Sequence, residues 1–214
     1  MTSPLVSVLI CTRNRRDRVS RVIQNYVAQD YPNKELVLVD DGDDLVSDLL
    51  ENLPDATYLY RPSKNLSEKR NHGIEAATGE YICHFDDDDW HGPNRLSDQV
   101  RMIEDSHADI VGYSHCYWWD EVRNVASHYM GPMWGATMLY RREFALDHPW
   151  DESISLAEDA PFTRNAVLHE KPAGENMVAV MHAGNWQRQY STNFWPIVPF
   201  EKLPIRFREE LENR

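Results

Sequence analysis

Four consecutive aspartates, Asp86 to Asp89, have the clearest chemical potential in this sequence, and they directly follow the short apolar run YICHF. Like charges a few ångströms apart repel by on the order of several kcal/mol where solvation is poor. Carboxylates two positions apart on an extended chain can present oxygens to one point, and Mg²⁺ and Mn²⁺ take oxygen ligands. The run therefore indicates either a site for a divalent cation or a solvated loop tip.

Two further polar clusters, Thr12-Arg13-Asn14 and Asp40-Asp41, also follow apolar runs. The preceding segments, LVSVLI and ELVLV, are typical of buried strands. In open parallel sheets, ligands bind beyond the carboxyl ends of the strands. We therefore expect these clusters and the aspartate run to meet at one edge of a sheet.

The elements that must position these residues alternate in the first half of the chain. Nearly continuous apolar strands separated by helical patterns predict a mostly parallel α/β sheet with right-handed crossovers. Gly79 follows the third helical pattern and is expected to be its carboxy-terminal cap. The predicted strands cover residues 5–10, 35–39, 57–60 and 81–85, and the predicted helices cover 19–27, 45–50, 67–77 and 95–105.

The second half of the chain has a different character. An aromatic segment with glycines over residues 113–140 predicts antiparallel strands or an irregular wall. Further strands are expected at 108–113 and 177–181, helices at 141–146 and 158–169, and a charged amphipathic helix at 200–214. No internal repeat or linker is visible, so we expect one domain over residues 1–214.

Composition limits the classes of function. The net charge is −13, from 22 basic and 35 acidic residues, which argues against a surface built mainly for nucleic acid or anionic lipid. No apolar stretch approaches the roughly 18 residues that span a bilayer, and the amino terminus lacks the pattern of a signal peptide. These features predict a cytoplasmic protein, in which Cys11, Cys83 and Cys116 are reduced thiols.

Six segments together, in this order, resemble family 2 of the glycosyltransferases. This resemblance implies a GT-A fold, which is a Rossmann-like α/β domain, with a donor-binding half over about residues 1–106 and a smaller antiparallel or irregular acceptor half over about 107–214. It also implies a nucleotide-diphosphate sugar donor, most commonly of uridine, a Mn²⁺ or Mg²⁺ ion, and inversion at the anomeric carbon. The segments are VSVLICTRNRRDRV, QDYPNKELVLVDDGDD, KRNHGIEAATGEYICHFDDDDW, LYRREFALDHPWDES, AEDAPFTRN and MHAGN.

The resemblance also implies roles for single residues on the donor side. Asp40 stands where an acidic residue commonly binds the base, and Asp86 is expected to contact the ribose or the sugar. Asp88 is expected to hold the metal, with His182 as a further ligand. The other residues implied to face the donor are Thr12, Arg13, Asn14, Asp41, Arg70, Asn71 and Asp87, although alternation along an extended chain turns Asp87 away from Asp86 and Asp88.

The catalytic base is expected at the pair Glu158-Asp159. Inverting transfer needs a carboxylate within hydrogen-bond reach of the attacking hydroxyl. The resemblance assigns this role to Asp159, with Glu158 orienting the acceptor or Asp159, while Arg188 is a candidate for stabilising the leaving group. Trp118, Trp119 and Trp134 are either core residues or faces on which sugar rings or bases stack.

Two other functions remain open. A nucleotidyltransferase acting on sugar phosphates would normally carry a glycine-rich loop after the first strand, and CTRNRRDR contains no glycine. A non-catalytic nucleotide- or carbohydrate-binding module would bind without turnover. The acceptor could be a saccharide, a protein, a small molecule or a nucleobase, of which the net charge disfavours nucleic acid, and the oligomeric state is not indicated.

Overall fold

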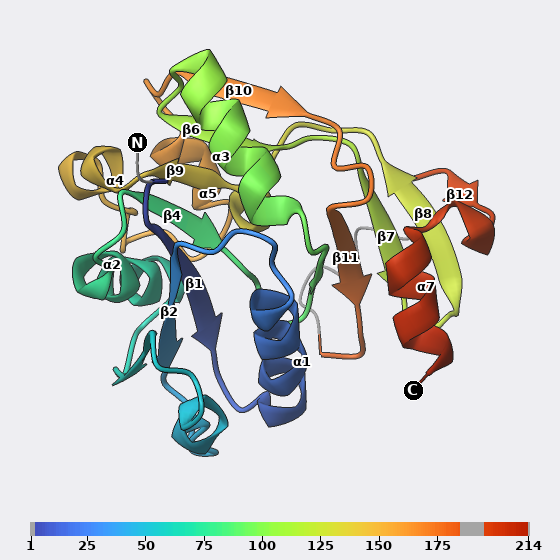
Figure 1. Ribbon diagram of the computed structural model, residues 1–214, viewed down its shortest axis with the longest axis horizontal. Coiled ribbons are helices and arrows are strands. Elements are labelled where there is room, and N and C mark those ends of the chain that lie inside the picture. The colour runs from blue at the N-terminus through green and yellow to red at the C-terminus, as the bar shows by residue number, and fades with distance from the viewer. Residues whose placement is uncertain (1–2, 185–194, 214) are drawn as a thin grey trace.

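The computed structural model describes residues 3–184 and 195–213, which form two sheets and the helices that cover them (Figure 1). Sheet A has seven strands in the order β10-β6-β9-β4-β1-β2-β3, and sheet B has five in the order β12-β8-β7-β11-β5. The strands of sheet A are β1 (Val6–Thr12), β2 (Lys34–Asp40), β3 (Ala56–Tyr60), β4 (Tyr81–His84), β6 (Ile110–Tyr113), β9 (Leu139–Arg141) and β10 (Leu168–Lys171). Those of sheet B are β5 (Trp90–His91), β7 (Cys116–Asp120), β8 (Val125–Tyr129), β11 (Met177–Met181) and β12 (Ile197–Val198).

Helices flank both sheets, and α1 lies between the strands of sheet A and those of sheet B in Figure 1. The α-helices are α1 (Arg16–Val27), α2 (Leu66–Ala76), α3 (Arg95–Ser106), α4 (Arg142–Asp147), α5 (Asp159–Phe162) and α7 (Ile205–Glu212). In the part of the chain that the structure describes, three further turns are 3₁₀-helical: η1 (Ser47–Leu50), η2 (Gly135–Thr137) and η3 (Phe200–Lys202).

The predicted parallel sheet is confirmed for the first half of the chain. Strand β1 pairs in parallel with both β2 and β4, and β2 pairs in parallel with β3. Strand β9 runs antiparallel to β4 and to β6. Thr12 and Asp40 are register partners at the carboxyl ends of β1 and β2, so the polar clusters that follow these strands lie at one edge of the sheet.

The apolar character of the central strands follows from burial on both faces. On one face of β1, Val8 and Ile10 belong to the core that includes Val22 of α1. On the other face, Leu9 belongs to the core that includes Ile74 of α2. A strand covered by a helix on each side cannot alternate between apolar and polar residues, which explains the continuous apolar runs of the sequence.

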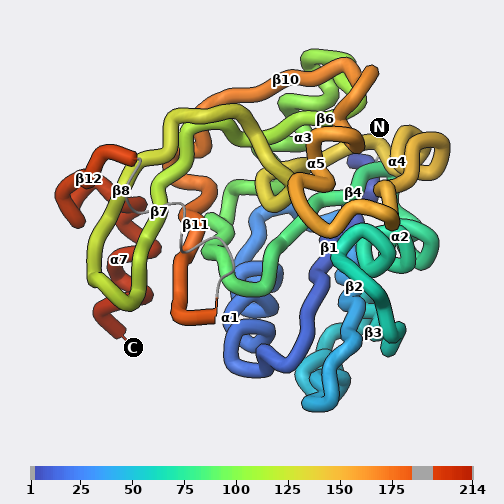
Figure 2. The backbone as a smooth tube through the Cα atoms, turned by 180° about the vertical axis from the view of Figure 1, so that it is seen from behind, coloured from blue at the N-terminus to red at the C-terminus, as the bar shows by residue number. Residues whose placement is uncertain are grey.

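The aromatic segment forms the antiparallel hairpin of β7 and β8, which agrees with the prediction of antiparallel strands. Strand β11 adds to this hairpin in parallel to β7. Phe207 of α7 is fully buried against sheet B, where it contacts Trp90 edge to face. Figure 2 shows sheet B and α7 as a layer beside sheet A.

Three of the predicted helices are wrong in extent, and one of them is the helix expected over residues 200–214, which is the turn η3 followed by α7 at Ile205–Glu212. The helix expected over residues 158–169 is only the single turn α5, and residues 168–171 form strand β10, which pairs with β6. Asn165 between them has a φ of 70°, a left-handed conformation that asparagine tolerates and that ends a helix. The helix expected over residues 45–50 is the short turn η1.

The prediction that Gly79 caps α2 is also wrong. The helix ends at Ala76, and the next residue, Ala77, is already extended with a φ of −64° and a ψ of 145°. The amide of Gly79 instead donates to Ser7 Oγ at 2.9 Å. A Cβ at this position would lie 2.6 Å from Ser7 Oγ and 2.8 Å from the carbonyl oxygen of Leu5, so glycine permits a close approach of two backbone segments.

We therefore expect Gly79→Ala to lower the free energy of unfolding by about 1–3 kcal/mol, because the added methyl group overpacks the contact with β1. Urea denaturation of the variant and the parent protein measures this difference. A change below about 0.5 kcal/mol, the range of neutral surface substitutions, would show that β1 and Gly79 are not in this close contact.

Candidate active site

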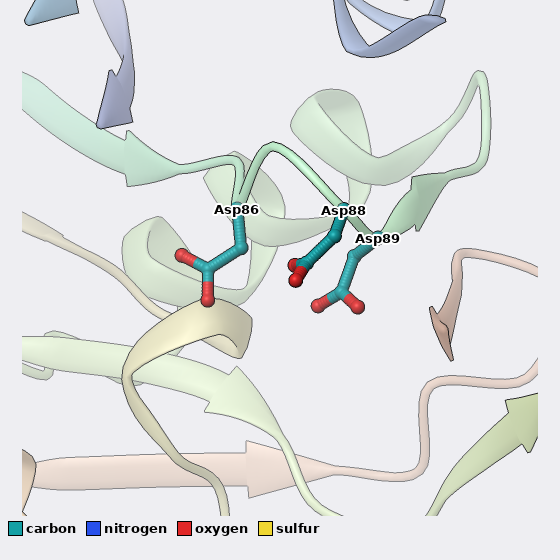
Figure 3. Close-up of side chains that lie close together, drawn as sticks. All are labelled: Asp86, Asp88 and Asp89. Atoms are coloured by element: carbon teal, nitrogen blue, oxygen red, sulfur yellow. The ribbon is translucent and has the colours of Figure 1, made fainter. Parts of the chain in front are cut away.

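The acidic run is the connection between the two sheets. Strand β4 ends at His84 in sheet A, and β5 begins at Trp90 in sheet B. The side chains of Asp86, Asp88 and Asp89 project from this connection toward one region (Figure 3). One carboxylate oxygen from each lies within 4.8 Å of the others. A sharp connection between strands thus brings together three hard oxygen donors, the type that Mg²⁺ and Mn²⁺ prefer.

Asp87 does not belong to this group. Its Oδ2 accepts a hydrogen bond of 2.7 Å from Thr12 Oγ1, and its Oδ1 lies 2.6 Å from a guanidinium nitrogen of Arg15. Asp87 turns away from Asp86 and Asp88, as expected, but the stated reason was wrong: the run is a turn in which the Asp89 amide donates to the Asp86 carbonyl oxygen at 3.3 Å, not an extended chain with alternating side chains. Both of its oxygens are engaged in fixing the acidic connection to the end of β1.

The electrostatics of the three carboxylates favour a cation among them. Burial raises the pKa of Asp86 to about 6; the charge of Arg70 opposes this shift, while Asp88 and Asp87 add to it. Burial, together with the charges of Asp88 and Asp86, raises the pKa of Asp89 well above its usual range. A divalent cation favours the ionised form of each carboxylate, so these residues fit the metal that the family resemblance implies.

His182 follows directly after β11 and lies beside the acidic connection. Its Nε2 is 3.1 Å from Asp88 Oδ2. Although burial acts to raise the pKa of Asp88, hydrogen bonding to His182 and the charge of Arg15 outweigh it, and the pKa is lowered. Asp88 therefore has the strongest tendency of the three clustered aspartates to stay ionised, and the structure brings together the two residues expected to bind metal.

These aspartates line a pocket of about 360 Å³ that also receives residues from distant parts of the chain. Arg15 reaches it from the start of α1, and Arg70 from α2. The rest of the wall comes from Leu66 at the start of α2 and from the second half of the chain: Trp118, Trp134, Gly135, Ala136, Ser155, Leu156, Ala157, Glu158, Asp159, Ala179 and Val180. The pocket thus joins the acidic connection with the pair expected to supply the catalytic base.

Arg70 is held rigidly in this pocket. Its guanidinium lies 4.2 Å from the ring centroid of Trp150 and 2.6 Å from Glu158 Oε1, and the residue is only 3% exposed. A Cβ on Gly135 would lie 2.8 Å from Nη2 of Arg70, so this glycine leaves room for the guanidinium. Arg70 therefore presents a fixed positive charge next to Asp86. The negative charge of Asp86 in turn favours the charged form of Arg70.

The pair of Arg70 and Glu158 gives a testable consequence for stability. We expect Arg70→Met to lower the free energy of unfolding by about 3 kcal/mol, because it leaves a largely buried carboxylate unpaired. The double variant Arg70→Met with Glu158→Gln should recover part of the loss in urea denaturation. Arg16→Met, which removes the ion pair of 2.8 Å with Asp48 on the exposed surface, is the matched control and should have little effect. Equal losses in both single variants would contradict the assignment.

Asp159 begins α5 and faces the same pocket. Its Oδ2 accepts a hydrogen bond of 3.2 Å from the backbone amide of Gly135. The preceding Ala157 has a φ of 54°, a left-handed conformation that is uncommon for alanine and turns the chain just before Glu158. Strain of this kind clusters at functional sites. The turn directs Glu158 to Arg70 and Asp159 to the pocket.

The remaining predicted donor residues lie at the edge of sheet A and not on this pocket. Asp40 is fully buried and accepts hydrogen bonds from the Gly42 amide at 2.8 Å and from Tyr58 Oη at 2.9 Å. Asp41 pairs with Lys69 at 2.6 Å. Asn14 Oδ1 accepts a hydrogen bond of 2.7 Å from the Asp43 amide, and Arg13 is exposed.

Asn71 is placed differently from the other predicted donor residues. Its side-chain amide donates to the carbonyl oxygen of Trp150 at 2.9 Å and accepts from the amide of the same residue at 3.0 Å. Asn71 thereby fixes α2 to the segment that carries Trp150, whose ring lies against Arg70. The structure thus gives Asn71 contacts with the protein that position its neighbour.

Sequence reasoning missed Arg15 and left Asp89 without a role. Arg15 contacts Asp88 Oδ2 at 3.1 Å as well as Asp87. Asp89 Oδ1 accepts a hydrogen bond of 2.9 Å from the amide of Val180, which connects the acidic run to β11. The dense basic residues of TRNRRDR were a signal for Arg15, whereas the contact of Asp89 depends on the position of a strand some ninety residues away.

The family model described as "Glycosyl transferase family 2" matches residues 7–160, which contain the acidic connection and the Glu158-Asp159 pair. The chain belongs to this family. An uncharacterized glycosyltransferase of Nostoc sp. (strain PCC 7120) is 33% identical over 116 residues, which cover 51% of this chain and 35% of the relative. The chain thus spans about a third of the length of this family member.

Solved structures of two other proteins share the fold. Staphylococcus aureus TarS 1–349 in complex with UDP-GlcNAc superimposes with a TM-score of 0.69 at 20% identity, over 84% of this chain and 59% of that one. The mannosyltransferase PcManGT of Pyrobaculum calidifontis, in complex with GDP-Man and Mn²⁺, gives a TM-score of 0.67 at 18% identity, over 85% and 57% of the two chains. The expected GT-A architecture is confirmed.

Three sequence-based expectations concern residues outside the pocket. Arg188 lies outside the described residues. The thiols of Cys11, Cys83 and Cys116 are free, as expected. Within residues 3–184 and 195–213, no helix combines the length and the apolar character needed to cross a membrane.

Proposed function

We propose that this family 2 chain is a metal-dependent inverting glycosyltransferase. In this proposal it transfers a sugar from a nucleotide-diphosphate sugar to an acceptor hydroxyl. One observation carries the proposal: a single pocket contains Asp86, Asp88 and Asp89 together with Arg70 and Asp159. A cation site, a fixed positive charge and a carboxylate base are the three groups that direct displacement from a diphosphate requires.

Asp159 is the proposed base. It accepts the proton of the acceptor hydroxyl as that oxygen attacks the anomeric carbon, and the diphosphate leaves from the opposite face, which inverts the configuration. The amide of Gly135 holds the carboxylate in position. The pairing of Glu158 with Arg70 keeps the second carboxylate away from the proton transfer.

The donor side of the proposal rests on the aspartate cluster and its neighbours. Asp88 and His182 would hold Mn²⁺ or Mg²⁺, with Asp86 toward the ribose or sugar and Asp89 beside them. When bound, the ion would stabilise the negative charge on the diphosphate. The charge of Arg70, fixed by Trp150 and Glu158, acts in the same direction without further reorganisation.

The proposed nucleotide pocket lies at the edge of sheet A, where Thr12, Arg13 and Asn14 come near Asp40 and Asp41. Residues 1–106 then form the donor-binding half of one domain, and 107–214 form the half that carries the base. A uridine donor is our first choice. TarS is described with UDP-GlcNAc and PcManGT with GDP-Man, so guanosine donors belong in the same test.

The rival functions predict different outcomes. A binding module needs no base, so Asp159→Asn would leave all of its measurable properties intact. A nucleotidyltransferase would consume a nucleoside triphosphate and a sugar phosphate. Asp159 lines the pocket that holds the aspartate cluster. This position favours sugar transfer, because neither a binding module nor a nucleotidyltransferase needs a base there.

Thermal stability in the presence of nucleotide sugars tests the proposal. A ligand that binds only the folded state raises the melting temperature. We expect UDP-, GDP- or dTDP-sugars to stabilise the protein with Mn²⁺ and to do so much less with EDTA. Stabilisation by none of these donors, or stabilisation only by a nucleoside triphosphate, would contradict the proposal.

A further inference from the structure

Part of the pocket wall is aromatic, although the proposed reaction assigns it no role. Trp118 of β7 and Trp134, directly before η2, both line the pocket. Their ring centroids are 5.8 Å apart, and their planes differ by 34°. Trp118 is 7% exposed, and Trp134 is partly exposed. An apolar ring surface therefore adjoins the carboxylates in the same pocket.

The contacts of Trp134 fix the orientation of its ring. Tyr129 meets it edge to face, with ring centroids 5.1 Å apart and planes at 85°. Tyr129 is itself held by a hydrogen bond of 3.0 Å from its hydroxyl to the carbonyl oxygen of Pro132. The backbone amide of Trp134 donates to Thr137 Oγ1 at 3.1 Å. A ring ordered in advance loses little conformational entropy when a ligand stacks on it.

Trp118 supports the wall from behind. It is 7% exposed, and its ring packs against Trp134 and against Trp195, whose ring centroid lies 4.5 Å away. Trp134 is the more exposed of the two pocket-lining rings, so it is the one that a ligand in the pocket can cover.

The aromatic wall is connected directly to the proposed base. Trp134 is followed by Gly135, whose amide donates to Asp159 Oδ2 at 3.2 Å. Trp134 and Asp159 thus line the same pocket and are linked through the amide of Gly135. A ring stacked on Trp134 would lie in the pocket that contains the base carboxylate.

The charges of the pocket select among ring-shaped ligands. Five carboxylates line it, from Asp86, Asp88, Asp89, Glu158 and Asp159. The two arginines, Arg15 and Arg70, are already paired with aspartates and with Glu158 respectively. An acidic acceptor would meet repulsion, whereas a neutral polyol offers hydroxyl groups that donate to carboxylates.

We infer that Trp134, supported by Trp118, is the binding platform for the acceptor, and that this acceptor presents a neutral saccharide ring. The apolar face of the sugar stacks on the indole, and its hydroxyl groups point to the carboxylates. This inference rests on the proposed function, because Asp159 as the base defines which side of the pocket receives the acceptor. It adds the chemical class of the acceptor and the residue that recognises it.

Saccharide-observed saturation-transfer NMR tests the inference without any turnover. The probes are cellobiose, maltose and N,N′-diacetylchitobiose, with glucuronic acid and adenosine for comparison, each with and without UDP and Mn²⁺. Trp134→Leu keeps apolar bulk against Trp118 but removes the aromatic face, and Trp134→Phe restores a smaller one. Tyr117→Ala is the control on the same strand as Trp118, because Tyr117 packs in another cluster, away from the pocket.

We expect at least one neutral saccharide to give a signal in the parent protein and in Tyr117→Ala. Trp134→Leu should weaken its affinity about tenfold, near the upper end of what ring stacking contributes, and Trp134→Phe should recover most of it. No neutral saccharide signal, an equal loss in Tyr117→Ala, or a preference for glucuronic acid or adenosine would overturn the inference. UDP binding is read separately, so saccharide binding at Trp134 without UDP binding would support the platform and count against the proposed transferase.

Discussion

Asp159→Asn should lower the rate constant for sugar transfer by about two to four orders of magnitude, the range that a positioned general base contributes. Asparagine has nearly the shape of aspartate and can still accept the hydrogen bond from the Gly135 amide, which the structure gives as 3.2 Å. The amide cannot accept a proton. The variant should therefore stay folded and bind the donor while its turnover is lost.

Steady-state kinetics separates this effect from a loss of binding. The expected pattern is a fall in kcat with the KM for the donor and the donor-induced rise in melting temperature unchanged. Glu158→Gln is the matched control, because Glu158 pairs with Arg70 at 2.6 Å and is not the proposed base. Its activity should fall less than that of Asp159→Asn. If Glu158→Gln were the more damaging change, the two roles would have to be exchanged.

Asp88→Asn should remove the metal dependence of donor binding. Asp88 lies 3.1 Å from Nε2 of His182 and belongs to the cluster whose carboxylate oxygens are within 4.8 Å of one another. Loss of a charged ligand should weaken Mn²⁺ binding by about 100-fold or more. Replacing a residue that only hydrogen-bonds to a metal ligand already lowers metal affinity by up to about 100-fold. Titration of Mn²⁺ followed by calorimetry measures the affinity directly.

Asp87→Asn is the control for this experiment because it changes the neighbouring aspartate in the same run. Asp87 is bonded to Thr12 and Arg15 and lies outside the cluster. Its replacement should lower stability but keep the affinity for Mn²⁺ within about tenfold of the parent protein. Equal losses of Mn²⁺ affinity in both variants would contradict the division of roles within the run.

The sequence allowed the central strands β1, β2 and β4 of sheet A to be predicted because burial on both faces leaves an unbroken apolar run. Val8 and Leu9 lie in different cores, yet both must be apolar. The extent of α5 could not be predicted, because residues 168–171 become a strand only through pairing with β6. The role of Gly79 likewise depends on its approach to Ser7, a contact between distant segments.

In the candidate site, too, short sequence motifs could be predicted, whereas contacts between distant segments could not. The aspartate run and the Glu158-Asp159 pair could be found because each is a short motif with a defined chemistry. The position of Trp134 could not, since its place beside Asp159 depends on the turn η2 and on the fold of both sheets. From the sequence alone, Trp134 could be either a core residue or a face on which a ligand stacks. Its place on the pocket wall favours contact with a ligand.

The most direct test of the central claim is the release of nucleoside diphosphate from the donor that stabilises the protein most. We predict Mn²⁺-dependent release in the parent protein that increases with a saccharide acceptor, falls at least about 100-fold in Asp159→Asn, and loses its response to Mn²⁺ in Asp88→Asn. Undiminished release in both variants, or none in a parent protein that binds the donor, would contradict the assignment of this pocket to sugar transfer.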